Sequence, residues 1–422
     1  MSGTLGVGIV GAGFVARFHL RAWQGVRHAD VVAVCSRTRE KAEAAAALAR
    51  ELDVGDPKAY TDAAALVRDP RVDAVWICAP NFARLEVMEA VAAHGRGKLR
   101  GVACEKPLGR TVKEARRMVA LAESLGAPHG YLENQLFMPT VARGKELLWR
   151  RGAAVAGRPY LARAAEEHGG PHEPWFWSGP RQGGGVLNDM MCHSIEAARF
   201  LLQEPGTPRG SMRPKAVSCD IATLKWSRRE YVERLRRDMG VDWSRGAAED
   251  FARATVAWEG DDGAPLVTEA TTSWGYVGPG LRLTVEVMGP EYSLQGNSLS
   301  NHLHVFFSRE VGGPGGEDLV EKQAAEQGLL PVVTDEAGEY GYTAEDRHMV
   351  DSFRAGKAPM ETFHDGLEVT KLLMACYMAA EQGRRLEWEP PGLEEFVPAV
   401  ARGEGTHFGA APPPSPGRAA RP

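Results

Sequence analysis

The sequence has few cysteines and no long apolar run. Its 422 residues include six cysteines, which stand apart at positions 35, 78, 104, 192, 219 and 376 without any C-x-x-C pair. This spacing is typical of buried thiols in a reducing compartment and argues against a disulfide framework or a zinc module. Because no stretch of about 18 apolar residues occurs, we expect no membrane-spanning segment.

An excess of one charge sign is also absent. Lysine and arginine total 50 against 55 aspartates and glutamates, so the formal net charge is -5 at pH 7. This balance gives no reason to expect a nucleic acid partner or an acidic membrane surface. The N-terminus enters a strand pattern almost at once, without a basic region, an apolar run and a cleavage site, so we expect a cytoplasmic protein. The length suits two or three globular domains.

The first part of the chain alternates apolar strands with helical segments. Strand patterns lie at 5–10, 31–36, 72–79 and 101–105, and helical patterns lie at 15–24, 40–52, 62–67, 85–94 and 112–125. The strands are nearly continuous in Val, Ile and Ala, as in parallel strands that helices cover on both faces. The alternation predicts a doubly wound α/β domain over residues 1–145.

From about residue 155 the pattern changes to longer segments in which apolar and polar residues alternate. They lie at 160–167, 216–222, 254–258, 266–274, 281–288 and 304–308. The alternation predicts an α+β domain over residues 146–390, with an open, mostly antiparallel sheet. Residues 228–250 are rich in charge and indicate a surface helix, for which a solvated face is favoured over a lid or an interface.

The C-terminal part carries two helix signals. Residues 343–346 (TAED) and 365–368 (DGLE) both have capping-box spacing. The second opens an apolar helix at about 364–383, which we expect to pack back near the first domain. The tail 403–422 is rich in proline and alanine, so we expect it to be disordered.

The most informative motif follows the first predicted strand. It reads Gly-Ala-Gly-Phe-Val-Ala, a G-x-G-x-x-[G/A] turn that leads into a helix. Such a turn places a pyrophosphate on a helix N-terminus. Gly11 permits the tight turn, Gly13 leaves room for the phosphates, and Ala16 lets helix and strand pack closely. The context predicts a dinucleotide site that includes Phe14 and Val15, and the alternative is a tight turn in another α/β protein.

The end of the second predicted strand bears on the choice of dinucleotide. NAD sites usually place a carboxylate there for the ribose hydroxyls, whereas this chain has Ser36, followed by Arg37 and Thr38. Arg37 could pair with a 2′-phosphate, and Ser36 or Thr38 could hydrogen-bond it. The sequence therefore slightly favours NADP over NAD. In the alternatives, Arg37 stacks on the adenine of NAD or is solvated at a helix start.

A lysine stands beside a proline at the carboxyl end of a buried strand. The segment reads Cys-Glu-Lys-Pro and lies where open α/β sheets bind ligands. A cis peptide bond between Lys106 and Pro107 would aim the ammonium group into the crevice. Lys106 could orient a substrate hydroxyl and stabilise a developing alkoxide, or carry a proton if burial lowered its pKa. Taken alone, a lysine at an exposed strand end is the simpler interpretation.

A glycine turn at 183–185 leads into a helix that carries an aspartate and a histidine. Asp189 and His193 are four residues apart and share one helix face. The carboxylate could then orient the imidazole and stabilise its protonated form during proton transfer. Taken alone, Asp189 would be a helix cap and His193 a core histidine. Together with the dinucleotide turn and Lys106, the catalytic interpretation is favoured.

These motifs together resemble the Gfo/Idh/MocA family of NAD(P)-dependent oxidoreductases. The matching segments, between residues 5 and 385, are GIVGAGFVA, VDAVWICAPN, CEKPLGRT, GGGVLNDMMCH and DGLEVTKLLMACYMAAEQGR. The resemblance implies a Rossmann domain, then a domain whose open antiparallel sheet carries the substrate site and often the oligomer interface. It also implies a catalytic group of Lys106, Asp189 and His193. We assign Ala79, Pro80, Asn81 and Glu105, together with Lys106, to the cofactor site.

The chain departs from the family pattern at several positions. Arg84 stands where many members have a histidine three residues beyond the asparagine, and Gln135-Leu136 replaces a common Asn-Arg pair before Phe-x-Pro. The segment at about 225–250 is longer than in minimal members. Family substrate contacts are therefore not carried over at these positions.

Aromatic and polar residues near the glycine turn could contact a substrate. Trp175 and Trp177 could stack on sugar rings or belong to the core, and Arg181 could bind a polar group, as could His168 and His172. Trp274 and Tyr276, at the end of a predicted strand, could face the pocket or a partner subunit. A metal site of His168, His172 and His193 is disfavoured because no ligand spacing is diagnostic, so we predict no metal.

The sequence favours an NAD(P)-dependent dehydrogenase of a sugar, cyclitol or related polyol. We expect His193, held by Asp189, to take the hydroxyl proton while Lys106 positions the oxygen. A redox-neutral alternative would use the same residues and recycle NAD, as a glycoside-cleaving hydrolase or lyase, or as an epimerase. A non-catalytic dinucleotide sensor is less favoured. The resemblance implies a homodimer or homotetramer, in which the exposed sheet face would be covered.

Overall fold

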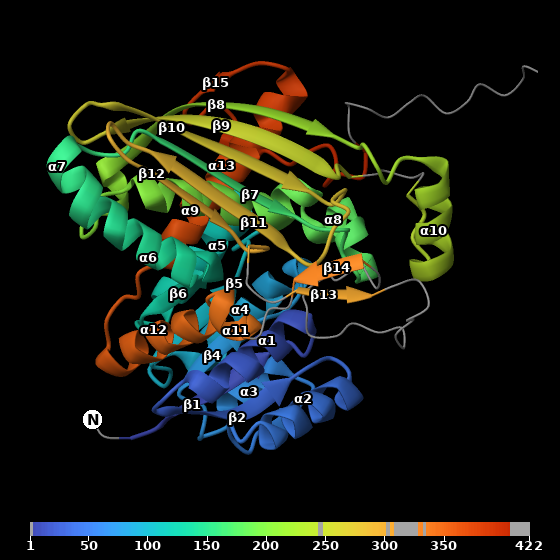
Figure 1. The fold of residues 1–422 in the computed structure, drawn as a ribbon. Helices are drawn as coiled ribbons and strands as arrows, with labels where there is room; N and C mark the ends of the chain where they lie inside the picture. The colour runs from blue at the N-terminus through green and yellow to red at the C-terminus, as the bar shows by residue number, and fades with distance from the viewer. Residues whose placement is uncertain (1–2, 244–247, 301–303, 308–327, 332–334, 406–422) are drawn as a thin grey trace, which may run out of the picture.

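The computed structural model describes residues 3–243, 248–300, 304–307, 328–331 and 335–405. The predicted disordered tail lies outside these residues from position 406 onward. Figure 1 shows two stacked layers, each built on its own sheet, with the N-terminal layer below. Among the described helices, none has the length and apolar character that are needed to cross a bilayer.

Six parallel strands form the first sheet, in the order β3-β2-β1-β4-β5-β6. They are β1 (Leu5–Val10), β2 (Ala29–Cys35), β3 (Lys58–Tyr60), β4 (Ala74–Ile77), β5 (Gly101–Glu105) and β6 (His129–Leu132). The order reverses between β1 and β4, which creates the crevice where ligands bind in doubly wound sheets. The predicted Rossmann architecture is confirmed, although the apolar pattern did not reveal β3 or β6, which have three and four residues.

Helices cover both faces of this sheet, so its strands are buried and apolar. The covering helices are α1 (Phe14–Ala22), α2 (Arg39–Glu51), α3 (Ala63–Arg68), α4 (Asn81–Gly95) and α5 (Val112–Ser124). α3, α4 and α5 pack in a row on one face, and α1 packs with α2 and α12 (Tyr342–Ala355) on the other. The C-terminal part of the chain therefore returns to the first layer.

The second sheet has seven strands, in the order β12-β11-β7-β10-β9-β8-β15. They are β7 (Leu161–Glu167), β8 (Met212–Ala222), β9 (Phe251–Gly260), β10 (Pro265–Ser273), β11 (Arg282–Met288), β12 (Ser293–Asn297) and β15 (Leu386–Glu387). Neighbouring strands are antiparallel except β7 and β10, which are parallel. The predicted mostly antiparallel sheet is confirmed. β13 (His304–Phe307) and β14 (Gly328–Pro331) form a separate ladder.

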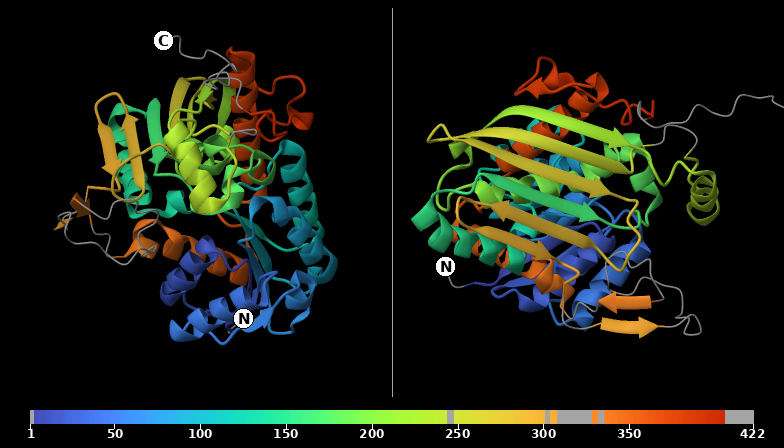
Figure 2. Two further views of the ribbon diagram at one scale, coloured as in Figure 1. Left: turned by 90° about the vertical axis from the view of Figure 1, so that its right-hand side faces the viewer. Right: turned by 45° about the horizontal axis from the view of Figure 1, so that its top comes forward.

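One face of the second sheet packs on helices. α9 (Val186–Leu202) contacts β7 and β10, while α13 (Phe363–Gln382) contacts β8 and also reaches α5 and β6 of the first layer. The inner strand residues are apolar, and residues such as Arg163 and Glu269 lie on the outer face. Figure 2 shows no helix over this outer face among the described residues.

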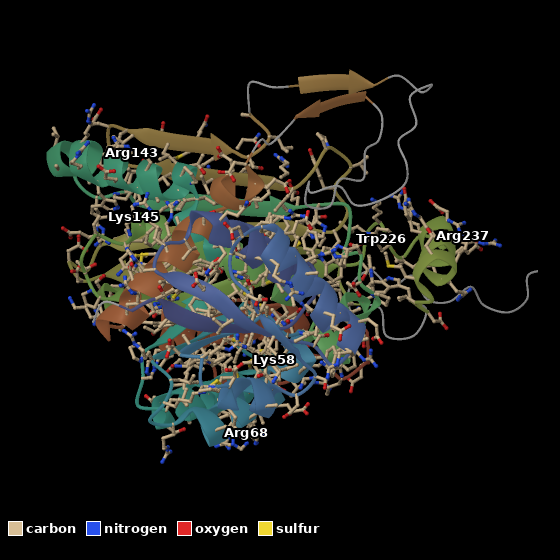
Figure 3. All side chains as sticks on the ribbon, turned by 90° about the horizontal axis from the view of Figure 1, so that it is seen from below. Lys58, Arg68, Arg143, Lys145, Trp226 and Arg237 are labelled. Carbon is tan, nitrogen blue, oxygen red and sulfur yellow. The ribbon has the colours of Figure 1, made fainter. Side chains whose placement is uncertain are left out.

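The remaining helical segments are mostly short. They are η1 (Trp23–Gly25), η2 (Asn134–Phe137), α6 (Pro139–Leu147), η3 (Leu148–Ala153), α7 (Ala154–Ala156), η4 (Pro174–Trp177), α8 (Gly179–Gln182), η5 (Arg209–Ser211), α10 (Arg229–Met239), α11 (Glu336–Glu339) and η6 (Leu393–Glu395). The predicted surface helix is α10, which stands out from the body with Arg237 exposed (Figure 3). Only Leu235 of this helix is buried.

Both predicted capping boxes are misplaced. α13 begins after Thr362, whose side chain forms a capping box with Asp365, so Asp365 is the third helical residue and not the cap. α12 begins after Gly341, which has a φ of +88° and no capping side chain. Each helix starts where the backbone turn before it ends, and the four-residue spacing in the sequence does not reveal that turn.

Candidate active site

The glycine turn has the geometry of a dinucleotide cradle. Gly11 has a φ of +126°, and a Cβ there would lie 2.4 Å from the carbonyl oxygen of Cys78. Gly13 precedes α1, and a Cβ there would meet no atom within 4 Å. No side chain caps α1 and no acid stands in its first turn. Open space in front of a bare helix N-terminus fits the pyrophosphate of a dinucleotide.

The residues after β2 gather around an aromatic ring at the start of α4. The Arg37 and Arg181 guanidinium carbons each lie 5.5 Å from the ring centroid of Phe82. The backbone N–H of Thr38 donates to Ser36 Oγ over 3.4 Å. Trp175 contacts the same Phe82 ring edge-on at 6.0 Å. Arg181 and Trp175, predicted as substrate contacts, therefore lie beside Arg37, at the end of the crevice predicted for the adenosine.

The loop after β4 is tied to neighbouring segments by buried polar side chains. Asn81 Nδ2 donates to the carbonyl oxygen of Gln182 over 2.9 Å, which joins α4 to α8 of the second domain. Arg84, which stands in place of the family histidine, donates to the carbonyl oxygens of Ala79 and Pro107. Arg84 therefore holds together the loops that follow β4 and β5, which include the predicted cofactor residues Ala79 and Pro80.

Lys106 points from the end of β5 to the first turn of α9. The predicted cis bond between Lys106 and Pro107 is present. Lys106 Nζ donates to the carbonyl oxygen of Asp189 over 2.9 Å and lies 3.6 Å from Asp189 Oδ1. Burial opposes the charge on Lys106, yet Asp189 and nearby acids outweigh it and raise the pKa of the ammonium group. The expectation that burial could lower this pKa is wrong, so Lys106 is a cation at neutral pH.

Asp189 does not hold His193. Its Oδ1 faces Lys106, and its Oδ2 accepts a hydrogen bond of 3.2 Å from Trp274 Nε1. Asp189 and His193 are four residues apart and lie on one face of α9, as predicted. Each side chain, however, contacts a residue of another element and not the other one. The predicted orientation of His193 by Asp189 is therefore wrong in this structure.

The partner of His193 is Glu133, which the sequence analysis missed. His193 Nδ1 makes a short contact with Glu133 Oε1. Glu133 directly follows β6 and has 0% of its surface exposed. A glutamate at the carboxyl end of a strand of the first sheet is a signal that could have been found, had β6 been recognised. Both residues lie close enough to Lys106 for its charge to act on them.

Burial favours the uncharged forms of both members of this pair. Burial, reinforced by the Lys106 charge, lowers the pKa of His193 to about 4. Burial raises the pKa of Glu133 well above its usual range. An imidazolium is therefore disfavoured, and an ionised Glu133 accepts a proton more readily than an ordinary carboxylate does. A proton that enters at His193 Nε2 can be balanced by transfer of the Nδ1 proton to Glu133, so that no positive charge stays on the buried ring.

A second carboxylate caps the helix that carries Asp189 and His193. Glu249 Oε1 accepts from the backbone N–H groups of Gly185 and Leu187, each over 3.0 Å, and from the Tyr377 hydroxyl over 2.6 Å. Gly184 has a φ of +158°, and a Cβ there would lie 2.0 Å from the Tyr377 oxygen. The glycine turn is thus needed for close approach of α13, and Glu249, not Asp189, satisfies the helix N-terminus.

Trp177 is a core residue and not an open stacking surface. It is 3% exposed, and its Nε1 donates to the carbonyl oxygen of Pro171 over 3.0 Å. Its ring lies about 5 Å from those of Trp226, Trp243 and Trp274. This packing corrects the prediction of Trp177 as a sugar contact and places it behind Trp274, the partner of Asp189.

The predicted histidines do not converge with His193. His168 is fully buried, and its Nδ1 accepts from the backbone N–H of Gly170 over 2.9 Å. His172 contacts the Phe14 ring edge-on at 4.8 Å, beside the glycine turn. Two other sets of described residues bring three potential metal ligands within 4.8 Å: Glu133, Cys192 and His193, and His19, Glu345 and Asp346. The first set overlaps the proton-transfer pair, and we assign no metal to either.

Two family models match the chain. Residues 5–130 match the model of the oxidoreductase family with an NAD-binding Rossmann fold, and residues 152–295 match the GFO/IDH/MocA C-terminal domain. Among curated proteins, the chain is 26% identical to D-apiose dehydrogenase of Paraburkholderia graminis, over 93% of this chain and 91% of the relative. It is 32% identical to 1,5-anhydro-D-fructose reductase of Ensifer adhaerens, over 47% of this chain and 56% of the relative.

Solved structures share the fold over nearly the whole chain. GenD2 from gentamicin A biosynthesis, in complex with NAD, is 25% identical with a TM-score of 0.72 and covers 92% of this chain and 98% of its own. Levoglucosan dehydrogenase, in complex with NADH, is 21% identical with a TM-score of 0.66, and the match covers 91% of this chain and 98% of that structure's chain. The two family models, the two-layer fold and the order of the motifs along the chain agree. The chain belongs to the Gfo/Idh/MocA oxidoreductase family.

Proposed function

We propose that this protein oxidises a secondary alcohol of a sugar, cyclitol or related polyol, with a nicotinamide dinucleotide as hydride acceptor. The observation that carries the proposal is a cation and a neutral proton acceptor side by side, namely Lys106 held by Asp189 and His193 held by Glu133. Both lie near the switch point of the first sheet, whose glycine turn fits a pyrophosphate. Relatives named as dehydrogenases of apiose, inositol and levoglucosan support this substrate class.

The chain's own residues have distinct roles in the proposed reaction. The bound dinucleotide supplies the hydride acceptor. Lys106 donates a hydrogen bond to the substrate oxygen and stabilises the negative charge that develops there. His193 Nε2 accepts the hydroxyl proton while its Nδ1 proton moves to Glu133. Asp189, fixed by Trp274, keeps the Lys106 ammonium group in place.

We further propose that the dinucleotide is NADP. Two guanidinium groups, Arg37 and Arg181, share the Phe82 ring next to Ser36, and both can pair with a 2′-phosphate. The nearby carboxylate of Asp62 is committed elsewhere, since it caps α3 and lies 3.8 Å from Arg68. No acid takes the place after β2 where NAD sites usually hold the ribose hydroxyls.

Replacing Arg37 with alanine tests this choice. We expect the Kd for NADPH to rise about tenfold to a hundredfold, because one charged hydrogen bond to phosphate contributes about 1.5–3 kcal/mol. The Kd for NADH should change less than threefold. Arg39→Ala is the matched control, because Arg39 is exposed and, among the described residues, bonds the backbone of Ala59 and, weakly, Glu43. An equal loss of affinity for NADPH and NADH in Arg37→Ala would contradict the proposal.

The activity itself is tested by the absorbance near 340 nm. Purified protein is mixed with NADP or NAD and with a panel of sugars, cyclitols and glycosides. A steady rise with one cofactor supports a net dehydrogenase. Consumption of a glycoside without a rise, by protein that retains bound cofactor, would replace this proposal with redox-neutral cleavage or epimerisation. Cofactor binding without any turnover would indicate a sensor.

A further inference from the structure

A second cavity lies beyond the C-terminal half of α9. Its volume is about 880 Å³, and α6, η3, the chain between α9 and β8, and the segment before α13 form its walls. Lys106, Glu133, Asp189 and His193 do not line it, so it is separate from the site described above. The lining residues used below are Lys145, Trp149, Arg199, Phe200, Arg209 and Glu361.

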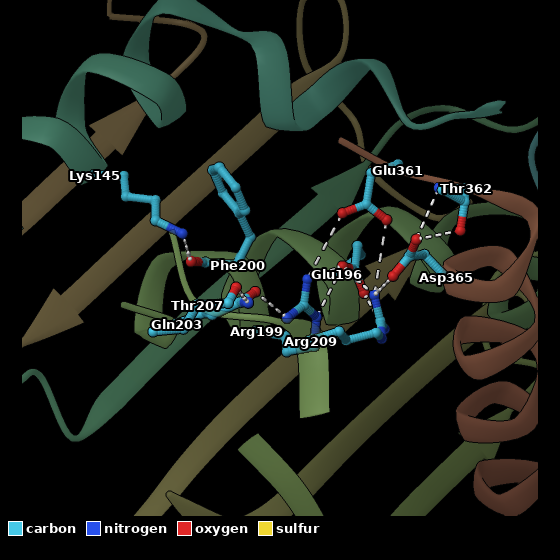
Figure 4. A network of polar contacts seen from close by, with 10 residues as sticks. All are labelled: Lys145, Glu196, Arg199, Phe200, Gln203, Thr207, Arg209, Glu361, Thr362 and Asp365. Carbon is cyan, nitrogen blue, oxygen red and sulfur yellow. Dashed lines mark hydrogen bonds and ion pairs between the residues drawn. The ribbon is translucent and has the colours of Figure 1, made fainter. Parts of the chain in front are cut away.

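The floor of this cavity is a buried network of acids and arginines (Figure 4). Glu196, on α9, accepts from Arg199 Nε over 2.8 Å and from Arg209 Nη1 and Nη2 over 2.7 and 2.6 Å. Arg199 Nη1 also donates to Gln203 Oε1 over 2.5 Å. Glu196 is therefore fully satisfied, and the two guanidinium groups are held in fixed positions.

Two other carboxylates in the network have unused hydrogen-bonding capacity. Glu361 is 2% exposed, and its Oε2 accepts no hydrogen bond from the described residues, with Arg209 Nη1 at 3.7 Å. Its Oε1 lies 3.7 Å from Arg199 Nη2. Asp365 Oδ1 lies 3.6 Å from Arg209 Nη1, while its Oδ2 is occupied by Thr362. An unsatisfied buried carboxyl oxygen that lines a cavity calls for a donor from outside the chain.

Lys145 and two aromatic side chains complete the walls. Lys145 Nζ donates to the carbonyl oxygen of Phe200 over 2.7 Å and lies 3.6 Å from the centre of the Phe200 ring. Burial, with the Arg199 charge, lowers the pKa of Lys145 to about 7. Trp149 donates its Nε1 proton to the carbonyl oxygen of Leu201 over 3.0 Å, which fixes the indole in the wall. The cavity thus combines flat apolar surface with closely spaced acceptors and donors.

We propose that this cavity binds a neutral polyhydroxylated molecule, such as a sugar or cyclitol, as a second site separate from the reaction centre. A hydroxyl group can donate to the Glu361 carboxyl group or accept from it, and it can accept from a guanidinium or from Lys145 at the same time. A ligand anion would meet the carboxylate of Asp365, and a ligand cation would meet the charges of Arg199 and Arg209. Trp149 offers the apolar face on which the C–H side of a sugar ring packs.

Equilibrium dialysis with radiolabelled D-glucose, levoglucosan and myo-inositol tests the proposal on the full chain, in the presence of reduced cofactor. We expect at least one of these probes to bind at two sites per chain in the wild type. Glu361→Gln should remove one of them, and Trp149→Leu should weaken the same site about tenfold. Glu146→Gln is the matched control, since Glu146 also lines the cavity but is exposed, and its ion pairs among the described residues are with the exposed Arg143 and Arg150.

The outcomes separate this proposal from the activity proposed above. Lys106→Ala should leave the second site intact, so loss of turnover with one remaining site still supports it. Binding of all probes at one site that Glu361→Gln and Trp149→Leu leave unchanged would overturn it, as would no binding by any probe. If Glu361→Gln lowers the melting temperature, the Trp149→Leu result decides.

Discussion

Replacing Lys106 with alanine is expected to lower kcat about 10²- to 10³-fold. The ammonium group is the charge that would face the substrate oxygen as it becomes an alkoxide, and loss of one such preorganised donor costs about 2.7–4 kcal/mol in the transition state. The Kd for the cofactor should change less than threefold, because the glycine turn and not Lys106 provides the pyrophosphate site. Steady-state kinetics and fluorescence titration of reduced cofactor measure the two effects.

Two controls separate chemistry from folding in this variant. Alanine leaves Asp189 buried opposite no cation, so the melting temperature is expected to fall, and the measurement is made well below it. Lys113→Ala removes an exposed lysine of α5, which pairs with Glu395, and should leave kcat within twofold of the wild type. If Lys106→Ala kept more than a third of wild-type kcat while folded, Lys106 would have no part in the chemistry.

Glu133→Gln is expected to lower kcat about 10²- to 10⁴-fold, the range that general base catalysis contributes. Glutamine has the size of glutamate and can hydrogen-bond Nδ1, but it cannot take the Nδ1 proton. Proton transfer to His193 would then leave an imidazolium in a buried site beside Lys106, which burial and that charge both disfavour. KM and the cofactor Kd should stay within threefold, because Glu133 is fully buried against His193.

The pH dependence distinguishes this role from a purely structural one. The relay needs a neutral His193 and an ionised Glu133, and burial raises the pKa of Glu133 well above its usual range, so wild-type kcat/KM is expected to fall as pH drops through that raised pKa. His193 itself, whose pKa is lowered to about 4, is still neutral where this loss begins. In Glu133→Gln the low kcat should persist at every pH between 5 and 8, while Glu123→Gln, on the surface, keeps the wild-type profile. If Glu133→Gln lowered kcat by no more than twofold, this result would contradict the relay.

Local sequence determined the parts of the site that depend on chain neighbours. The turn at Gly11 and Gly13 lies within a few residues of both elements it joins, and glycine is the residue that such a backbone permits. The lysine at the end of a buried strand and the Asp189–His193 spacing on one helix were equally visible, because strand ends and helix faces follow from pattern alone. β3 and β6 were not recognised in the sequence, because strands of three or four residues are too short to show a hydrophobic period.

Only the tertiary structure decided which side chains meet and which are charged. Glu133 and His193 are 60 residues apart, and Lys106 and Asp189 are 83 apart. They come together because α9 lies against the segments that follow β5 and β6, namely Lys106 and η2. The same packing removes water, which lowers the pKa of His193 and raises that of Glu133. The sequence by itself determined the fold class and the residue types at the site. The partners and protonation states arise from long-range contacts and burial, which no local pattern contains.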